Sequence, residues 1–264
     1  MRTLRASLAV LLTGLLSLCL WQPAMADTTA DSPETPALQW TYKSETGPDF
    51  WGSLDASFAT CASGQSQSPI NLTGAEDIDL LNPEFHYDAV SLNLLNNGHT
   101  VQVPYAPGSY VLLNGKRFEL RQFHFHSPSE HTINGHAESA ELHLVHQNEA
   151  GELAVIAVLL HRDKDDDSTA YLPISQNLPL KAGDKVRTGK TINAEALLPL
   201  RTTTYRYSGS LTTPPCSESV DWWVMSEPVS ISAEQLAQYE QLLDHNNRPL
   251  QDVNTRSLQL DISF

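Results

Sequence analysis

The sequence predicts a single, mainly β domain with a few short helices. Short segments in which apolar and polar residues often alternate recur through the middle of the chain, and this period is typical of strands. An Asn114-Gly115 pair, which suits the tight turn of a β-hairpin, separates two of these segments. No linker, repeat or low-complexity tract follows residue 38, and an apolar fraction of 41 % over 264 residues is enough for one sizeable core.

The strand segments are short and rich in β-branched, leucine or aromatic residues. In chain order they are 91–97, 100–105, 110–113, 117–126, 141–147, 153–161 and 219–231. One helix is predicted over 232–243, because Ser232 and Gln235 form a capping-box pattern at its start.

The first 26 residues are predicted to be a secretory signal peptide. Two arginines precede a long apolar run, and Ala24-Met25-Ala26 then provides a small-x-small cleavage site. A transmembrane anchor is the alternative, but the apolar run 6–21 is shorter than the roughly 20 residues that a span needs. Residues 27–38 are a polar, proline-containing leader, so the folded domain is predicted over 39–264. We therefore expect an exported protein without a membrane anchor, in the periplasm, with extracellular release as the alternative.

Cysteine content agrees with export. Cleavage of the signal peptide removes Cys19 and leaves Cys61 and Cys216. An even pair in an exported protein suggests one disulfide, and two free thiols are the alternative. The formal net charge of −15 argues against nucleic acid and anionic membranes as partners.

Three histidines form a candidate metal site. Side chains two apart in a strand share a face, so His124 and His126 point the same way, and His143 lies in another alternating segment. If the two strands are neighbours, the three imidazoles can converge. Three neutral imidazoles suit zinc and leave a fourth position open for water.

The surrounding residues strengthen this interpretation. A histidine in a strand is by itself more often structural than a ligand, but Gln122 and Glu141 each lie two residues before a candidate ligand, on its face. Metal-bound imidazoles usually donate their second N–H to such groups. The remaining histidines are predicted to be structural or exposed, with His131 and His146 as candidates to support the site: His86, His131, His136, His146, His161 and His245.

Several long motifs resemble those of the alpha-class carbonic anhydrases, and especially of the exported bacterial members. The similarity runs from about residue 40 to the C-terminus. It covers "GQSQSPINL" (64–72), "LNNGHT" (95–100), "QFHFHSPSEHT" (122–132), "AELHLVH" (140–146), "GSLTTPPC" (209–216) and "NRPLQ" (247–251).

The resemblance implies a large, twisted, mostly antiparallel central sheet and a zinc enzyme. The implied reaction is the reversible hydration of carbon dioxide to bicarbonate and a proton, by attack of a zinc-bound hydroxide. It implies one zinc ion per chain, held by His124, His126 and His143, and a disulfide between Cys61 and Cys216. The oligomeric state stays open, with a homodimer among the alternatives.

The resemblance also implies roles around the metal. Gln122, Glu141 and the backbone carbonyl of Asn246 orient the ligand imidazoles. Thr212 accepts a hydrogen bond from the zinc-bound hydroxide and donates its own proton to Glu130, and His99 is the proton shuttle. The implied substrate pocket is Val145, Val155, Leu211, Val220, Trp222 and Thr213, and the implied polar positions near the water network are Tyr42, Asn97, Gln102 and Tyr207.

Three positions depart from common members of the family. Ser127 follows the "HFH" motif where many animal members have tryptophan, Gln102 replaces a common asparagine, and Thr100 stands where a smaller residue is frequent. These departures bear on the conformation of His99 and on the turnover rate rather than on the reaction.

Two other functions are consistent with parts of the sequence. "HFHSPSE" also fits the start of a cupin motif, which would make Glu130 a ligand of iron or manganese beside two histidines. The glycines of the first cupin motif are misplaced, however, and a second motif with its distant histidine is not found. A non-catalytic binding module is the other alternative, and the retained ligands, Thr212 and Glu130 argue against it.

Overall fold

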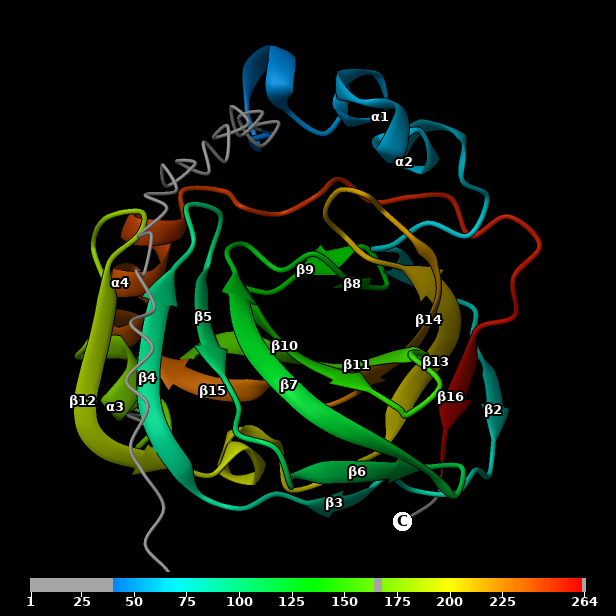
Figure 1. Ribbon diagram of the computed structural model, residues 1–264. Coiled ribbons are helices and arrows are strands. Elements are labelled where there is room, and N and C mark those ends of the chain that lie inside the picture. The colour runs from blue at the N-terminus through cyan, green and yellow to red at the C-terminus, as the bar shows by residue number, and fades with distance from the viewer. Residues whose placement is uncertain (1–39, 164–167, 263–264) are drawn as a thin grey trace, which may run out of the picture. The chain divides into compact units, whose positions relative to one another are not determined.

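The computed structural model describes residues 40–163 and 168–262, and the predicted signal peptide and leader lie outside them. The described ranges contain one 13-stranded sheet and one small sheet. The main sheet runs in the order β12-β4-β5-β7-β10-β11-β14-β13-β16-β2, with β15 beside β11, β6 beside β7, and β3 beside β6 (Figure 1). Its strands are β2 Glu76–Ile78, β3 Glu84–His86, β4 Val90–Asn96, β5 Val101–Pro104, β6 Tyr110–Leu113, β7 Lys116–His126, β10 Ala140–Gln147, β11 Leu153–Asp163, β12 Lys185–Ile192, β13 Thr204–Ser210, β14 Glu218–Met225, β15 Val229–Ser232 and β16 Gln259–Asp261.

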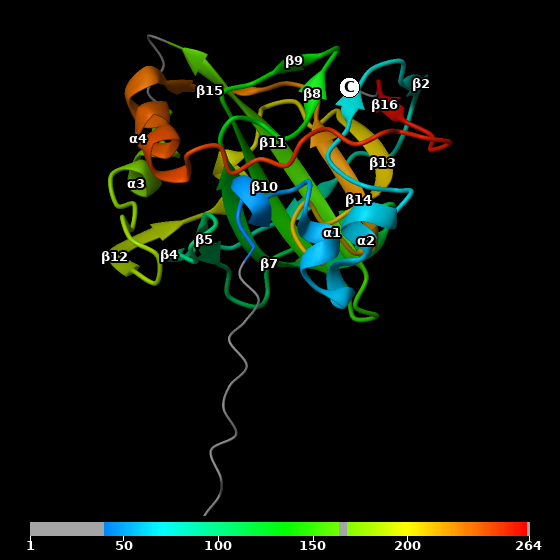
Figure 2. The ribbon, with the colours of Figure 1, turned by 90° about the horizontal axis from the view of Figure 1, so that it is seen from above.

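The remaining elements are short. The small sheet consists of β1 Asn71–Leu72, β8 Thr132–Ile133 and β9 His136–Ala137. The helices are η1 Ser44–Thr46, α1 Trp51–Leu54, η2 Ala56–Phe58, α2 Thr60–Ser63, α3 Leu172–Ser175, η3 Ala194–Leu197 and α4 Ala233–Leu243. Seen from above, α3 and α4 lie at the same side, away from α1 and α2 (Figure 2). No helix among the described residues is long and apolar enough to span a bilayer.

The predicted fold class is confirmed. The domain is mainly β, and most strand pairs of the main sheet are antiparallel. The parallel pairs are β11 with β14, β11 with β15, and β16 with β2.

Two local predictions from turn and cap chemistry are confirmed. Asn114 and Gly115 both have positive φ, 49° and 75°, and join β6 to β7 as a tight hairpin. At the start of α4, the Ser232 hydroxyl accepts from the Gln235 backbone N–H at 3.2 Å, and the Gln235 side chain accepts from the Ser232 N–H at 3.1 Å.

Other strand predictions were incomplete. The segment 219–231 is two strands, β14 and β15, because Ser226–Pro228 interrupt it and both parts pair with β11. The remaining strands were not predicted: β1, β2, β3, β8, β9, β12, β13 and β16. β12 lies at the edge of the sheet and is largely exposed, so burial imposes little apolar alternation on it.

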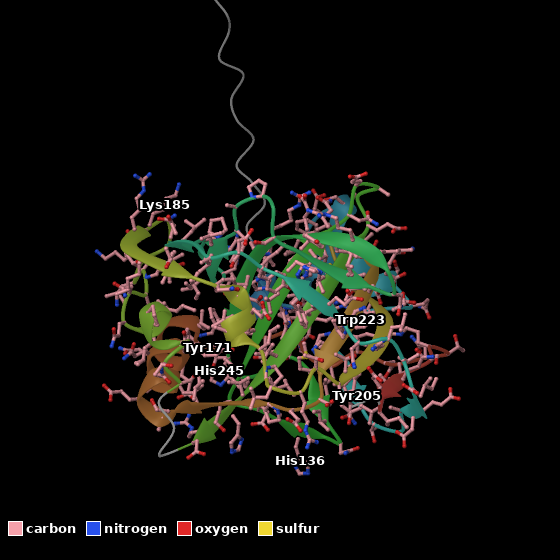
Figure 3. All side chains as sticks on the ribbon, turned by 90° about the horizontal axis from the view of Figure 1, so that it is seen from below. His136, Tyr171, Lys185, Tyr205, Trp223 and His245 are labelled. Atoms are coloured by element: carbon pink, nitrogen blue, oxygen red, sulfur yellow. A yellow bond between two sulfur atoms is a disulfide. The ribbon has the colours of Figure 1, made fainter. Side chains whose placement is uncertain are left out.

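The core lies on both faces of the sheet. Phe123 and Phe125 of β7 are fully buried in the larger cluster, as the alternation predicted. Val155 and Trp222 belong to a second cluster. Figure 3 shows Lys185 at the margin, in agreement with its exposure.

The predicted disulfide is present. Cys61 of α2 is bonded to Cys216, which follows β13. Both cysteines are buried beside Trp51, so the bond fastens the N-terminal helices to the turn between β13 and β14.

Candidate metal centre

The strand register brings the three candidate ligands together. β7 and β10 are antiparallel neighbours, and His143 lies directly opposite His124. Directly opposed residues share a face of the sheet, and His126 lies two positions after His124. The two strands are therefore neighbours, as the predicted convergence of the three imidazoles required.

Each of the three imidazoles offers one ring nitrogen, and these atoms lie within 4.8 Å of one another. His126 and His143 are each 1 % exposed, while His124 is partly exposed. The fold thus closes two ligands away from water and leaves the third at the open side of the site.

The second nitrogen of every imidazole has a hydrogen-bond acceptor. His124 Nδ1 lies 2.9 Å from Gln122 Oε1, His126 Nδ1 lies 2.7 Å from the Asn246 carbonyl, and His143 Nε2 lies 2.8 Å from Glu141 Oε1. These contacts select the tautomers in which Nε2 of His124 and His126, and Nδ1 of His143, keep their lone pairs.

The donor set fits a zinc ion. Burial, followed by the two neighbouring imidazoles, holds the pKa of His124 well below its usual range, and burial also lowers the pKa of His126 and His143. The buried Nε2 of His126 has no hydrogen-bond partner. Three neutral imidazoles with converging lone pairs form the ligand set of a catalytic zinc site with an open position.

Glu141 links this site to further buried groups. Its Oε1 also lies 2.6 Å from Nδ1 of His131, and its Oε2 accepts the backbone N–H groups of Glu130 and His131 at 2.8 Å each. Burial opposes ionisation, but His131 and His143 together hold the pKa of Glu141 well below its usual range. The carboxylate is therefore a fixed anion that can orient His143.

His131, Glu141 and His143 also lie close enough to form a metal-binding group. Here the carboxylate is already committed to both imidazoles by short hydrogen bonds, so we interpret this group as support for the site. Glu130 belongs to neither group of metal-competent residues in the described ranges. A cupin-like ligand set of two histidines and Glu130 therefore has no geometric support.

Glu130 lies beside the ligands, and Thr212 lies near Glu130. Glu130 Oε1 accepts the backbone N–H of Arg248 at 2.8 Å, and its Oε2 lies 3.9 Å from His143 Nδ1 without a hydrogen-bond partner. Burial raises the pKa of Glu130 to about 7, although His143, Arg248 and the Thr212 hydroxyl act to lower it. Thr212 itself is 5 % exposed.

An apolar wall adjoins the imidazoles. Val145 lies opposite Val155, and Val155 lies beside Trp222. The Trp222 ring lies 5.0 Å from the His143 ring, centroid to centroid. Thr213 is partly buried in the turn between β13 and β14. The other five predicted pocket residues lie in or against one hydrophobic cluster: Val145, Val155, Leu211, Val220 and Trp222.

His99 is half-buried in the turn between β4 and β5. Its ring stacks on Trp40, with centroids 3.7 Å apart and planes 6° apart. Burial lowers its pKa. A cavity of about 500 Å³ opens beside it and is lined also by Tyr42, Thr100 and Asn246.

The predicted polar positions lie on different parts of the site. Asn97 Nδ2 lies 3.5 Å from Gln102 Oε1. Burial, followed by the charge of Glu130, raises the pKa of Tyr42 well above its usual range. The Tyr207 hydroxyl is within hydrogen-bond distance of His131 Nε2, at 2.7 Å, and of Ser68 Oγ, at 2.8 Å.

Among the remaining histidines, only His131 joins the site. His146 bonds the Tyr87 hydroxyl at 2.6 Å in the larger core cluster instead. The others are exposed: His86, His136, His161 and His245. Figure 3 shows His136 at the margin.

Sequence reasoning assigned no role to two residues that contact the site. Trp40 stacks on His99 from 59 positions away in sequence, and no local pattern indicates such a contact. Arg248 is 2 % exposed and donates from its side chain to Gln67 Oε1 and to the Cys61 carbonyl, at 2.9 Å each. The place of Arg248 in the "NRPLQ" motif was the signal in the sequence that could have suggested a role for it.

Comparisons with known proteins agree on one family. The model of the family described as eukaryotic-type carbonic anhydrase matches residues 46–261. A carbonic anhydrase of Nostoc sp. is 40 % identical over 250 residues, which cover 91 % of this chain and 89 % of the relative. A carbonic anhydrase of Klebsiella pneumoniae is 38 % identical over 83 % of this chain and 90 % of the relative.

Solved structures are similar as well. A hyperthermostable carbonic anhydrase from an active hydrothermal vent chimney shares 43 % identity, with a TM-score of 0.80, over 84 % of this chain and all of that one. The alpha-carbonic anhydrase of Thermovibrio ammonificans, solved with the inhibitor sulfanilamide, shares 39 % identity, with a TM-score of 0.81, over 84 % of this chain and 99 % of that one.

Proposed function

The chain belongs to the alpha carbonic anhydrases, zinc lyases that hydrate carbon dioxide reversibly, and on this premise we propose that His124, His126 and His143 hold the catalytic zinc. One observation carries the proposal. Three imidazole nitrogens converge within 4.8 Å while the other nitrogen of each ring is committed to an acceptor. Such an arrangement orients lone pairs toward one point, as a metal requires.

When bound, zinc lowers the pKa of its water to about 7 and so supplies hydroxide near neutral pH, an effect for which carbonic anhydrase is the standard example. The chain's own residues hold and surround that position. Gln122, Glu141 and the Asn246 carbonyl orient the three imidazoles. His124 lies at the partly exposed side, through which substrate enters.

Thr212 and Glu130 have a directional task. A hydroxyl provides one donor and two acceptor sites. If the Thr212 hydroxyl donates a hydrogen bond to ionised Glu130, the Thr212 oxygen can only accept a hydrogen bond. By accepting one from the attacking oxygen, Thr212 would orient a lone pair of that oxygen toward the carbon atom of the substrate. The Arg248 backbone N–H occupies Glu130 Oε1, and the buried Oε2 remains available to accept from Thr212.

The apolar wall receives carbon dioxide. The substrate is small and without charge, so a dry surface beside the metal is enough to hold it. Val155, Val220 and Trp222 are each 2 % exposed or less and present such a surface next to His143. Bicarbonate leaves toward the open side.

His99 is proposed as the proton shuttle. Protonation near the diffusion limit, roughly 10¹⁰ M⁻¹s⁻¹, combined with a pKa of about 7, allows proton release to water at only roughly 10³ s⁻¹. Faster turnover needs a base that exchanges protons with buffer, and an imidazole titrates in the right range. His99 is half-buried and lines a cavity, which supports exchange of protons with the surroundings.

We also propose that the protein acts after export, in the periplasm. The disulfide supports an oxidising compartment. The signal peptide at residues 1–26 and its cleavage remain part of this proposal, and N-terminal sequencing of the protein recovered from a bacterial periplasm would test it.

The central test is stopped-flow carbon dioxide hydration by the purified, disulfide-bonded protein before and after zinc removal. We expect fast hydration that is lost with zinc and restored by it. His143→Gln should abolish both zinc retention and hydration, while His161→Gln, which alters an exposed histidine, should change neither. A folded, zinc-loaded protein without hydration would contradict the proposal, and iron or manganese with oxidase activity would favour the cupin alternative.

A further inference from the structure

The turn that carries His99 is attached to the strand that carries two of the proposed zinc ligands. Within the turn, the side chain of Asn97 accepts the backbone N–H groups of His99 and Thr100 at 2.9 Å each. These bonds shape the turn locally but do not connect it to the sheet. The connection to β7 comes from two other side chains.

Thr100 makes the first connection. Its hydroxyl donates to the carbonyl oxygen of Phe125 at 2.6 Å and accepts from the Phe125 N–H at 3.2 Å. Phe125 lies between His124 and His126 in β7. β5 begins only at Val101, so Thr100 lies just outside the strand. From this position its side chain hydrogen-bonds both the N–H and the carbonyl of Phe125.

Asn246 makes the second connection. Its Nδ2 donates to the carbonyl oxygens of His99, at 3.0 Å, and of Phe125, at 2.9 Å, while its Oδ1 accepts the Ser127 N–H at 2.9 Å. Its own carbonyl accepts from His126. The residue is 2 % exposed, and one side chain therefore joins the shuttle turn to both sides of the His126 position.

We propose that Thr100 and Asn246 are positioning residues for proton transfer, which set where the backbone of His99 stands relative to the zinc ligands. This inference rests on the proposed function, in which His99 is the shuttle. The Phe125 carbonyl has two lone pairs and receives both side chains, so its acceptor capacity is filled. Both connections reach the backbone at or beside His99, and neither involves its imidazole, whose ring stacks on Trp40.

The Thr100 hydroxyl gives the sharper test, because Thr100 touches neither the proposed ligands nor the substrate wall. Thr100→Val keeps the shape of the side chain and removes both hydrogen bonds. Thr100→Ser keeps the hydroxyl and removes the methyl group. If the hydroxyl positions the turn, only the valine variant should slow proton transfer, roughly fivefold or more, because the net value of two hydrogen bonds is lost.

Two rates separate proton transfer from the chemical step. Steady-state hydration in weak buffer requires net proton release, whereas isotope exchange between carbon dioxide and bicarbonate at equilibrium does not. We expect Thr100→Val to lower the first rate and leave the second unchanged, and added imidazole buffer should restore the first. Thr100→Ser should match the unaltered protein in both rates.

Three results would overturn the inference. Thr100→Val could behave like the unaltered protein, the serine and valine variants could be equally slow, or both rates could fall together without rescue by imidazole. If Thr100→Val does not fold, Thr100→Ala compared with Thr100→Ser makes the same comparison. His99→Ala is the reference: if it slows both rates equally, the shuttle role fails and takes this inference with it, whereas a split in His99→Ala without one in Thr100→Val refutes the positioning role alone.

Discussion

Glu141 Oε1 lies 2.8 Å from Nε2 of His143, deep in the sheet, where neither side chain has appreciable contact with water. The same oxygen is shared with His131, and the other carboxylate oxygen holds two backbone N–H groups. The carboxylate thus fixes both the tautomer of His143 and the course of the chain after β7.

Glu141→Gln should weaken zinc binding about 10- to 100-fold, the usual cost of altering a group that orients a metal ligand. The amide keeps the size of the side chain, but it loses the charge and cannot accept all the donors that surround Glu141. Competition with a chelator of known affinity measures the dissociation constant. Glu138→Gln, which alters a partly exposed carboxylate paired with His161, is the matched control and should bind zinc normally. Equal zinc affinity in the two variants would refute the orienting role.

Thr212→Val should lower kcat/KM for carbon dioxide hydration about 100-fold, which is the scale of losing one oriented hydrogen bond in an active site. Valine preserves the volume of the side chain but neither donates to Glu130 nor accepts from the attacking oxygen. Thr212→Ser should keep most of the activity. Zinc content measured on the same samples excludes metal loss as the cause, and a fully active valine variant would show that the hydroxyl has no part in the reaction.

Removing the disulfide should destabilise the protein, by roughly 4–5 kcal/mol at most in the chain-entropy account. The bond joins residues separated by 155 positions, so its removal increases the conformational entropy of the unfolded chain considerably. The free energy of unfolding of the Cys61→Ala/Cys216→Ala variant, compared with that of the oxidised protein in urea, measures the effect. Reductant should lower the stability of the unaltered protein and leave that of the double variant unchanged. If reductant destabilised both proteins, its effect would not come from this disulfide.

Stability should fall with acid through His146. Burial lowers the pKa of His146 to about 3 in the folded protein, whereas an unfolded histidine titrates near 6.5. Between these values the unfolded chain binds the additional proton, so this contribution is complete above about pH 6.5 and is lost as the pH falls toward 3. From pH 7 to pH 5 the loss is about 2 kcal/mol.

The double variant Tyr87→Phe/His146→Leu tests that origin. It removes both partners of the buried hydrogen bond, so no polar atom of this pair is left without a partner. Its free energy of unfolding should change less between pH 7 and pH 5 than that of the unaltered protein. An unchanged pH dependence would assign the acid sensitivity to other groups.

The candidate site was predicted in two different ways. Alternation placed His124 and His126 on one face and paired Gln122 and Glu141 with the ligands, because side chains two apart in a strand must share a face. The structure has those contacts. The role of Asn246 in orienting His126 was predicted only from the resemblance to a family, since no local pattern connects the two residues across 120 positions.

The fold shows the same division. The hairpin at Asn114-Gly115 and the start of α4 followed from chemistry within four residues, and the structure contains both. The edge strand β12 did not follow, because it is largely exposed and burial imposes little apolar alternation on it. The break between β14 and β15 was missed although Pro228 lies within the segment.

By itself, then, the sequence determined a mainly β domain, a pair of cysteines and three histidines on strand faces that suit a metal. Only the tertiary structure decided that β7 and β10 are neighbours in the register that opposes His124 to His143, that Glu141 is shared with His131, and that Thr100 and Asn246 tie the His99 turn to β7. The physical reason is the range of the interactions. Side-chain alternation and turn preferences act within a few residues, whereas a metal site requires atoms from distant segments to meet within a few ångströms, and strand pairing alone brings them there.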